Sequence, residues 1–308
     1  MSADKIIEED TSCCASCGVA AGDDVKLKNC TACYLVKYCS IKCQKEHRPK
    51  HKRACKERAA ELRDEILFKQ PESSHVGDCP ICCLPLSLDV MKSSMTACCS
   101  KLICNGCYCA NERREEEASL DQRCPFCRAP LPKEGEYDKY IMKRIEANDP
   151  AAMRQEGLGK YYKGDFTGSF EYCSKAAEAG DADAHCQLSR LYNLGHGVEK
   201  DEKKEVHHLE EAAIRGHPKA RYNLGCHESD NGNIERAVKH WIIAATQGHG
   251  LSIKALMDLF KEGGVSRDDL AAALRAHHAA VDATKSPQRE EAEACDRIRD
   301  TMHAKDSN

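Results

Sequence analysis

The sequence predicts two small, cysteine-rich α+β modules followed by an all-α helical repeat solenoid, and three observations carry this prediction. Of the 22 cysteines, 18 lie between Cys13 and Cys127. From about residue 139 the composition changes to Ala, Leu, Tyr and Gly at helical spacing. The same half repeats a short motif in steps of 36 and 32 residues, and periods of this size indicate stacked helix pairs.

Composition narrows the class of protein. The net charge of −4 and a pI of about 6.4 do not favour a general nucleic-acid binder. No run approaches the roughly 18 apolar residues of a membrane span, and the acidic N-terminus has no apolar core typical of a signal peptide. We therefore expect a reducing cytoplasmic or nuclear compartment and no membrane partner. In that compartment spaced cysteines are metal ligands rather than disulfides.

The change from cysteine-rich to Ala- and Leu-rich sequence divides the chain into segments. A run without Gly or Pro at 54–69 predicts a helix that ends before Pro71. The 308 residues suit two or three domains with short connections. The expected segments are a disordered tail (1–12), a first module (13–55), a helical linker (56–78), a second module (79–132), helical repeats (140–288) and a C-terminal helix or tail (289–308).

The repeats share the motif Ala-Ala-x-x-Gly at 176–180, 212–216 and 244–248. A small residue follows each glycine by four positions and a leucine by eight, so two helices can approach closely where they cross. Glycine suits the left-handed residue just beyond a helix end. The segment from Leu188 to Lys204, with Gly195 and Gly197, resembles the Sel-like subclass of tetratricopeptide repeats. That resemblance covers about 148–285.

The first module has eight ligands of the kind that zinc prefers. A structural zinc site takes four such ligands in a tetrahedron, so eight allow two sites. Pairs with two residues between them can form turns whose amides point at the sulfurs, and pairs with three residues between them can share one helical face. The candidate ligands are Cys14, Cys17, Cys30, Cys33, Cys39, Cys43, His51 and Cys55. Cys13 is a possible competitor of Cys14, but Cys14 sets the two-residue gap to Cys17.

This spacing, with Tyr38-Cys39-Ser40 and Cys43-Gln44, resembles a MYND zinc finger. The resemblance implies interleaved sites, in which Cys14, Cys17, Cys39 and Cys43 bind one ion and Cys30, Cys33, His51 and Cys55 bind the other. It also implies proline-containing peptides as partners. The family usually has an aromatic residue near His47, whereas this chain has Arg48.

Residues 42–58 hold eight Lys or Arg against two Glu. A nucleic-acid face is one interpretation. The other, which we favour, is a solvated face that offsets the negative charge of thiolate-rich zinc centres. No aromatic residues are interleaved there to stack on bases.

The second module opens with Cys79-Pro-Ile-Cys82 and closes with Cys124-Pro-Phe-Cys127. Between them lie Cys98-Cys99 and Cys104-x2-Cys107. The pattern resembles a RING domain, with Lys101 at the usual histidine position, and is closest to the all-cysteine variant. That resemblance implies a cross-brace in which Cys79, Cys82, Cys104 and Cys107 bind one ion and Cys98, Cys99, Cys124 and Cys127 bind the other. Cys109 is the alternative to Cys98. The two modules would then hold four zinc ions.

The RING resemblance implies a ubiquitin ligase that binds a ubiquitin-conjugating enzyme and recruits protein substrates. Ile81 and Pro125 occupy the positions that contact that enzyme, and Arg128 the position of a cation that orients ubiquitin. Because Arg128 lies outside the coordination shell, we expect Arg128→Ala to leave folding intact. The competing hypothesis is a zinc-dependent interaction adaptor without ligase activity, which Lys101 favours.

No other catalytic motif is visible in the sequence. His207-His208 and His277-His278 have no partner at ligand spacing and are interpreted as exposed histidines on repeat helices. Cys173, Cys186 and Cys226 are interpreted as small buried residues.

Overall fold

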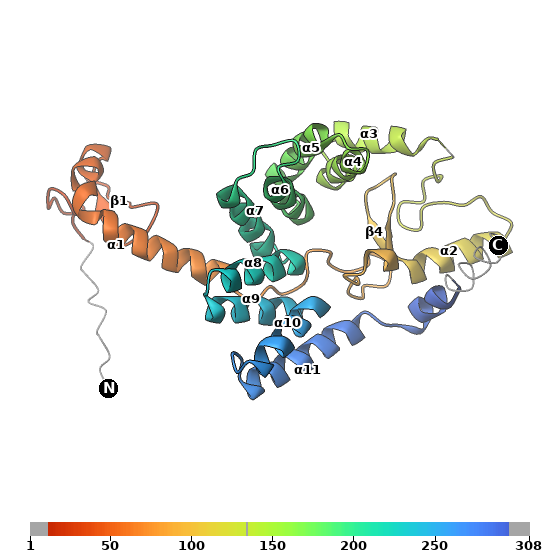
Figure 1. The fold of residues 1–308 in the computed structure, drawn as a ribbon. Coiled ribbons are helices and arrows are strands. Elements are labelled where there is room, and N and C mark those ends of the chain that lie inside the picture. The colour runs from red at the N-terminus through yellow and green to blue at the C-terminus, as the bar shows by residue number, and fades with distance from the viewer. Residues whose placement is uncertain (1–11, 134, 296–308) are drawn as a thin grey trace. The chain divides into compact units, whose positions relative to one another are not determined.

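The computed structural model describes residues 12–133 and 135–295 (Figure 1). Two compact units divide between Lys69 and Gln70. The expected tail lies outside the described residues except for Ser12, as does the chain beyond residue 295. Within the described ranges, no helix combines the length and apolar character needed to cross a membrane.

The first unit folds around its cysteines. Strands β1 (Lys28–Asn29) and β2 (Lys37–Tyr38) pair antiparallel, with Lys28 opposite Tyr38. Helix α1 (Ile41–Leu67) follows, and the Cys43 amide donates to Oγ of the N-cap residue Ser40 at 3.2 Å. The buried core consists of Cys14, Cys30, Cys33, Tyr38 and Cys43. With so few apolar side chains inside, the unit has little besides its ligand groups to stabilise it.

The predicted helix at 54–69 is longer than expected. It begins at Ile41, contains Pro49 and ends at Leu67, so the helical part of the expected linker at 56–78 continues directly from the finger. The run without Gly or Pro led the sequence prediction to start the helix after Pro49, because proline removes one backbone donor. Residues 68–78 are not helical. They form the connection to the second module.

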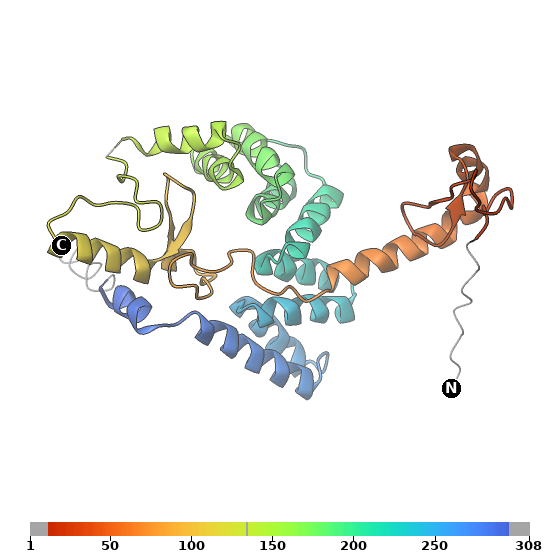
Figure 2. The same cartoon turned by 180° about the vertical axis from the view of Figure 1, so that it is seen from behind.

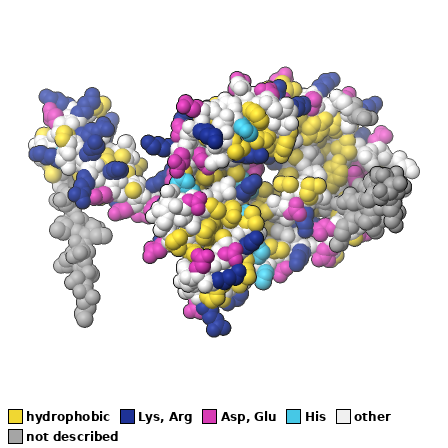
Figure 3. Space-filling model, in the orientation of Figure 1, with side chains coloured by type: hydrophobic (Ala, Val, Ile, Leu, Met, Phe, Trp, Pro, Cys, Tyr) yellow, Lys and Arg dark blue, Asp and Glu magenta, His cyan; other side chains and the backbone are white. Residues whose placement is uncertain are grey.

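Basic side chains gather over the first unit, as Figure 3 shows. Part of this charge on α1 is paired along the helix: Lys42 lies 4.0 Å from Glu46, and Arg53 lies 2.9 Å from Glu57. These pairs are exposed, so each contributes little to stability.

The second module combines one short sheet with one helix. Strands β3 (Ser93–Met95) and β4 (Leu102–Cys104) pair antiparallel after the 3₁₀ turn η1 (Val90–Lys92), and α2 (Asn105–Glu117) follows β4. Cysteines again fill the core, together with Leu86 and Ile103.

The predicted helical repeat solenoid is present. The helices are α3 (Tyr137–Glu146), α4 (Pro150–Tyr162), α5 (Phe166–Glu178), α6 (Ala182–Leu194), α7 (Glu202–Ile214), α8 (Pro218–Asp230), α9 (Ile234–Thr246), α10 (Gly250–Lys261) and α11 (Arg267–Ala283). Helices α4 to α11 stack as consecutive pairs in chain order (Figures 1 and 2). Residues 287–295, after α11, are also helical.

The repeated motif lies where the helices cross. The first alanine of each motif and the small residue four positions after each glycine are fully buried. Ala176, Ala184, Ala212, Ala220, Ala244 and Ser252 are all 0% exposed. Gly180, Gly216 and Gly248 have φ of 92°, 80° and 89°, a region that side chains disfavour. The small side chains therefore set the helix spacing, and the glycines end the preceding helix.

The connection at 70–77 packs along the repeat turns. The His75 amide donates to the Gly216 carbonyl at 3.0 Å, and the Gln247 side-chain amide donates to the Ser73 carbonyl at 3.1 Å. A Cβ at Gly216 would lie 2.9 Å from the Ser73 carbonyl oxygen. Gly216 thus serves both the turn and this close approach, and the second module is joined to the repeats by a docked segment.

We predict that Ala220→Trp severely destabilises the repeats, because an indole has no space at a helix crossing. Overpacking of this kind typically costs about 1–3 kcal/mol or more. Thermal unfolding followed by circular dichroism measures the effect. Lys219→Trp is the matched control, since Lys219 is the exposed neighbour on the same helix. Equal melting temperatures for the two variants would contradict this packing.

Candidate metal centres

Four groups of side chains each bring four ligand atoms within 4.8 Å of one another. Two lie in the first unit and two in the second module. The groups are Cys14, Cys17, Cys39 and Cys43; Cys30, Cys33, His51 and Cys55; Cys79, Cys82, Cys104 and Cys107; and Cys98, Cys99, Cys124 and Cys127. Each combines ligands from two separate stretches of chain, as an interleaved arrangement requires.

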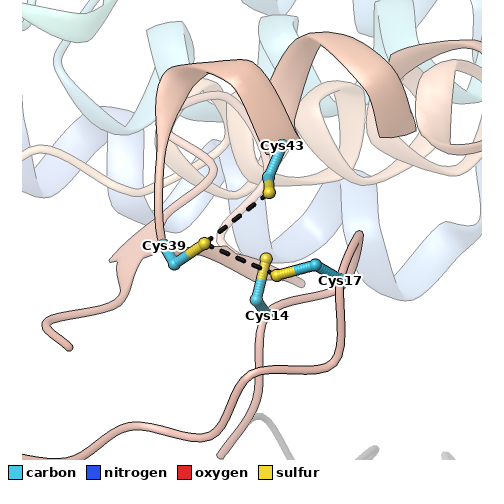
Figure 4. Close-up of side chains that lie close together, drawn as sticks. All are labelled: Cys14, Cys17, Cys39 and Cys43. Atoms are coloured by element: carbon cyan, nitrogen blue, oxygen red, sulfur yellow. Dashed lines mark hydrogen bonds between the residues drawn. The ribbon is translucent and has the colours of Figure 1, made fainter.

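The first group lies between the N-terminal loop and the start of α1 (Figure 4). Cys14 and Cys17 come from the loop, Cys39 follows β2, and Cys43 comes from the first turn of α1. The Cys39 sulfur lies 3.6 Å from the sulfurs of both Cys17 and Cys43. Cys13, the possible competitor, is exposed and is not among these ligands.

The second group uses the next turns of the same helix. The Cys33 sulfur lies 3.2 Å from His51 Nε2, and the Cys30 sulfur lies 3.8 Å from that of Cys55. Burial lowers the pKa of His51, which favours the neutral imidazole that binds metal. Because α1 supplies ligands to both groups, the helix and the two centres depend on one another.

These distances fit zinc. A tetrahedron with Zn–S bonds of about 2.3 Å has S–S edges of roughly 3.8 Å. The sulfur pairs of the second module lie at 3.8 Å (Cys82 and Cys104), 3.4 Å (Cys98 and Cys127) and 3.9 Å (Cys99 and Cys124). A disulfide needs about 2.05 Å, so this spacing suits ligands around an ion.

Backbone amides prepare several sulfurs for metal. Burial opposes ionisation of the Cys14 thiol, but the amides of Cys17 and Cys39 donate to its sulfur, and its pKa falls to about 6. Cys79 and Cys124 show the same balance, and the pKa of each falls to about 7. The thiolate is the form that binds metal, so the amides favour that form at these three sulfurs, whereas hydrogen bonds with the neighbouring thiols of Cys17 and Cys43 raise the pKa of Cys39 to about 12.

The adjacent Cys98 and Cys99 both reach the fourth group. Ser100, which follows them, has a positive φ of 55°, and Thr96 Oγ1 lies 3.1 Å from the Cys99 sulfur. This tight turn directs both thiols inward. Cys109, the alternative to Cys98, is not one of the ligand atoms in this group. Lys101, at the position of the usual histidine, holds its ammonium 5.8 Å from the Phe126 ring centroid.

Arg128 has an internal partner that the sequence did not reveal. Its guanidinium lies 2.8 Å from Oε1 of Glu115, which is 0% exposed, and donates to Asn111 Oδ1 at 2.8 Å. Burial opposes ionisation of Glu115, but the Arg123 amide and Arg128 outweigh it and lower the pKa of that carboxyl. This contact predicts that Arg128→Ala lowers the stability of the module, because it removes one partner of a buried carboxylate.

A fifth group, His75, Asp183 and His217, joins the connection to the repeats. The Nε2 atoms of His75 and His217 lie 3.1 Å and 3.2 Å from the same Asp183 oxygen. The Ala220 amide donates to His217 Nδ1, so in the neutral ring Nε2 carries the proton and donates to Asp183. The two rings stack at 4.1 Å between centroids, too close for two imidazoles converging on one ion. This group is a hydrogen-bonded contact that holds the connection.

Of the four repeat histidines expected to be exposed, His207 and His278 are exposed, whereas His208 and His277 are half-buried. Three other histidines of the repeats, His185, His217 and His240, are buried, at 7%, 5% and 0% exposure. Cys173 is buried, as the sequence suggested, and Cys186 and Cys226 are half-buried. The position of His217 directly after a repeat glycine marks it as a helix N-cap. That is the one signal in the sequence that could have located it.

Two family models match the chain. The MYND finger matches residues 14–55, and the Sel1 repeat matches residues 151–181, 182–217 and 218–249. A MYND finger implies zinc binding, and Sel1 repeats indicate protein partners. The chain is therefore a zinc-binding protein of the protein-interaction class.

Solved structures add two similar repeat proteins. A Sel1 repeat protein from Oxalobacter formigenes is 25% identical with a TM-score of 0.42, and the match covers 51% of this chain and 66% of that one. The protein c5321, a protective antigen of uropathogenic Escherichia coli with an SLR fold, is 27% identical with a TM-score of 0.40, covering 46% and 32%. The match thus spans less than two thirds of either structure. No curated protein matches this chain.

We expect four zinc ions per chain, one in each four-ligand group. Cys39→Ser should reduce the zinc content of the full chain to about two, because loss of one ligand unfolds the first unit, whose two centres share α1. Cys13→Ser is the control and should retain four, since Cys13 lies outside every group. Zinc measured by atomic emission against protein concentration gives the result. A wild-type content near two would contradict the assignment of one module.

Proposed function

We propose that this protein is a RING-type ubiquitin ligase, in which the second module binds a ubiquitin-conjugating enzyme. The MYND finger and the repeats would recruit the protein substrates. Such a ligase forms no bond to ubiquitin. It accelerates transfer by holding the thioester in an orientation suited to attack. We also propose a cytoplasmic or nuclear location, because reduced thiols persist in those compartments.

The observation that carries this proposal is the exposure of apolar side chains within both zinc loops. Ile81 is 41% exposed although it lies between two ligands, and Phe126 beside Pro125 is 42% exposed. Pro125 itself is half-buried. A docking surface for another protein needs exposed apolar side chains, and Ile81 and Pro125 lie at the positions where the RING resemblance puts that surface.

The proposed role of Arg128 must include its bond to Glu115. The Arg128 side chain is 45% exposed, so part of the guanidinium is available while Glu115 and Asn111 fix its direction. In a ligase this fixed cation would meet ubiquitin without losing side-chain entropy on binding. The same contact supports the second candidate, an interaction adaptor without ligase activity, in which Arg128 only ties the last zinc loop to α2.

Single-turnover discharge of charged conjugating enzyme to free lysine, with the full chain, separates the two candidates. We expect acceleration with at least one conjugating enzyme. Ile81→Ala should raise the concentration of the chain needed for half-maximal discharge, because the conjugating enzyme loses docking area. Val90→Ala is the matched control, since Val90 is an apolar side chain of the same module that is 80% exposed. If the fully zinc-loaded chain does not accelerate discharge with any conjugating enzyme, the adaptor is favoured.

Arg128 requires a different variant from the usual alanine. Arg128→Ala should lower the melting temperature as well as discharge, because it removes a partner of buried Glu115. Arg128→Lys retains the positive charge beside Glu115 but loses the forked donors. We therefore expect it to keep most of the thermal stability while discharge at saturating conjugating enzyme falls. If discharge by Arg128→Lys equals wild type, Arg128 has no part in orienting ubiquitin.

A further inference from the structure

The chain after α11 returns to the second zinc module. Residues 287–295 are helical and lie beside α2 in both ribbon views (Figures 1 and 2). Two side chains of this terminal helix are buried there, Arg289 at 8% and Ala292 at 2% exposure. Ion pairs flank them: Glu293 lies 2.9 Å from Lys92, and Glu291 lies 3.0 Å from Arg113.

Arg289 reaches a metal ligand directly. Its Nη2 donates to the Cys82 sulfur at 3.3 Å and to the Leu84 carbonyl at 3.1 Å. Its Nη1 donates to the carbonyls of Pro85 and Thr284, each at 2.7 Å. One guanidinium thus connects the loop that follows Cys82 to the segment that follows α11.

The backbone of α2 leaves space for this arginine. A Cβ at Gly106 would lie 2.9 Å from Arg289 Cγ and 3.0 Å from its Cα. Gly106 is next to the ligand Cys107, so the terminal helix packs against the turn that supplies the other half of the same centre. Both halves of the third group are therefore in contact with one residue.

Charge explains what this contact does. Four thiolates around Zn²⁺ carry a net charge of −2, and a buried cation beside them offsets part of it. Charge-assisted hydrogen bonds to an ionised acceptor are about twice as strong as neutral ones, and partners of ligands commonly tune metal affinity. The fourth group offers an internal comparison, because the hydroxyl of Thr96 rather than a guanidinium contacts its Cys99 sulfur.

We propose that Arg289 is a positioning residue for the centre formed by Cys79, Cys82, Cys104 and Cys107, and that the terminal helix docks in a metal-dependent manner. The bond to Cys82 is stronger when that sulfur is a zinc-bound thiolate than when it is a neutral thiol, so loading the centre stabilises the docked helix. By the reciprocity of linked equilibria, docking then retains the metal. This inference depends on zinc in the third group and holds for a ligase or an adaptor.

The test uses the full chain loaded with ¹¹³Cd, which gives one resonance for each centre. Arg289→Ala should shift one of the four resonances and leave three unchanged. With the zinc form, release of one ion to a chromogenic chelator should accelerate about 10-fold. Hydrogen exchange of residues 287–295 should rise in the same variant. Gln288→Ala is the control, because Gln288 is an exposed residue on the same helix.

Two further variants separate positioning from simple packing. Arg289→Lys keeps the charge near Cys82 and should partly restore slow release. Ala292→Asp undocks the helix without touching the sulfur, and should shift the same single resonance even if Arg289→Ala folds poorly. Release rates equal to wild type in an undocked helix, or changes spread over all four resonances, would overturn the proposal. None of these readouts involves ubiquitin, so the outcome is independent of the proposed ligase activity.

Discussion

Both N-terminal modules depend on the convergence of four donor atoms on a point about 2.3 Å from each sulfur. Neither has an apolar core large enough to replace this constraint, since the buried side chains of the first unit are mainly the cysteines themselves. Metal binding and folding are one process in such modules. The strands, the start of α1 and the turn at Ser100 follow from the positions that the ligands must occupy.

The repeats are stabilised in a different way, by close packing of their helices. Their helices approach closely because alanine stands at the crossings, and dispersion contacts between close backbones replace large side chains. The contacts that join the second module to the repeats include the stacked histidines that meet Asp183 and the guanidinium of Arg289. Burial opposes the charge on Asp183, but bonds from His217 and His75 outweigh it and hold the pKa of that carboxyl well below its usual range.

Much of this architecture could be read from local spacing. Ligands three or four positions apart are governed by turn and helix geometry, which acts over a few residues, and the motif repeated in steps of 36 and 32 residues indicates stacked helix pairs. Contacts between distant segments could not be read in this way. Nothing in the sequence links Arg289 to Cys82 or Arg128 to Glu115. The sequence prediction started the helix after Pro49, whereas α1 begins at Ile41 and continues through that proline.

The return of the C-terminus to Cys82 also has a consequence for biosynthesis. About 160 residues separate the last cysteine ligand from Arg289, and at roughly 5–20 residues per second the ribosome needs on the order of 10–30 s to make them. During that interval the nascent module has its full set of thiols but lacks its final covering helix. On the proposed docking, metal delivery has a period of open access in the newborn chain, which closes once residues 287–295 have been made and have docked.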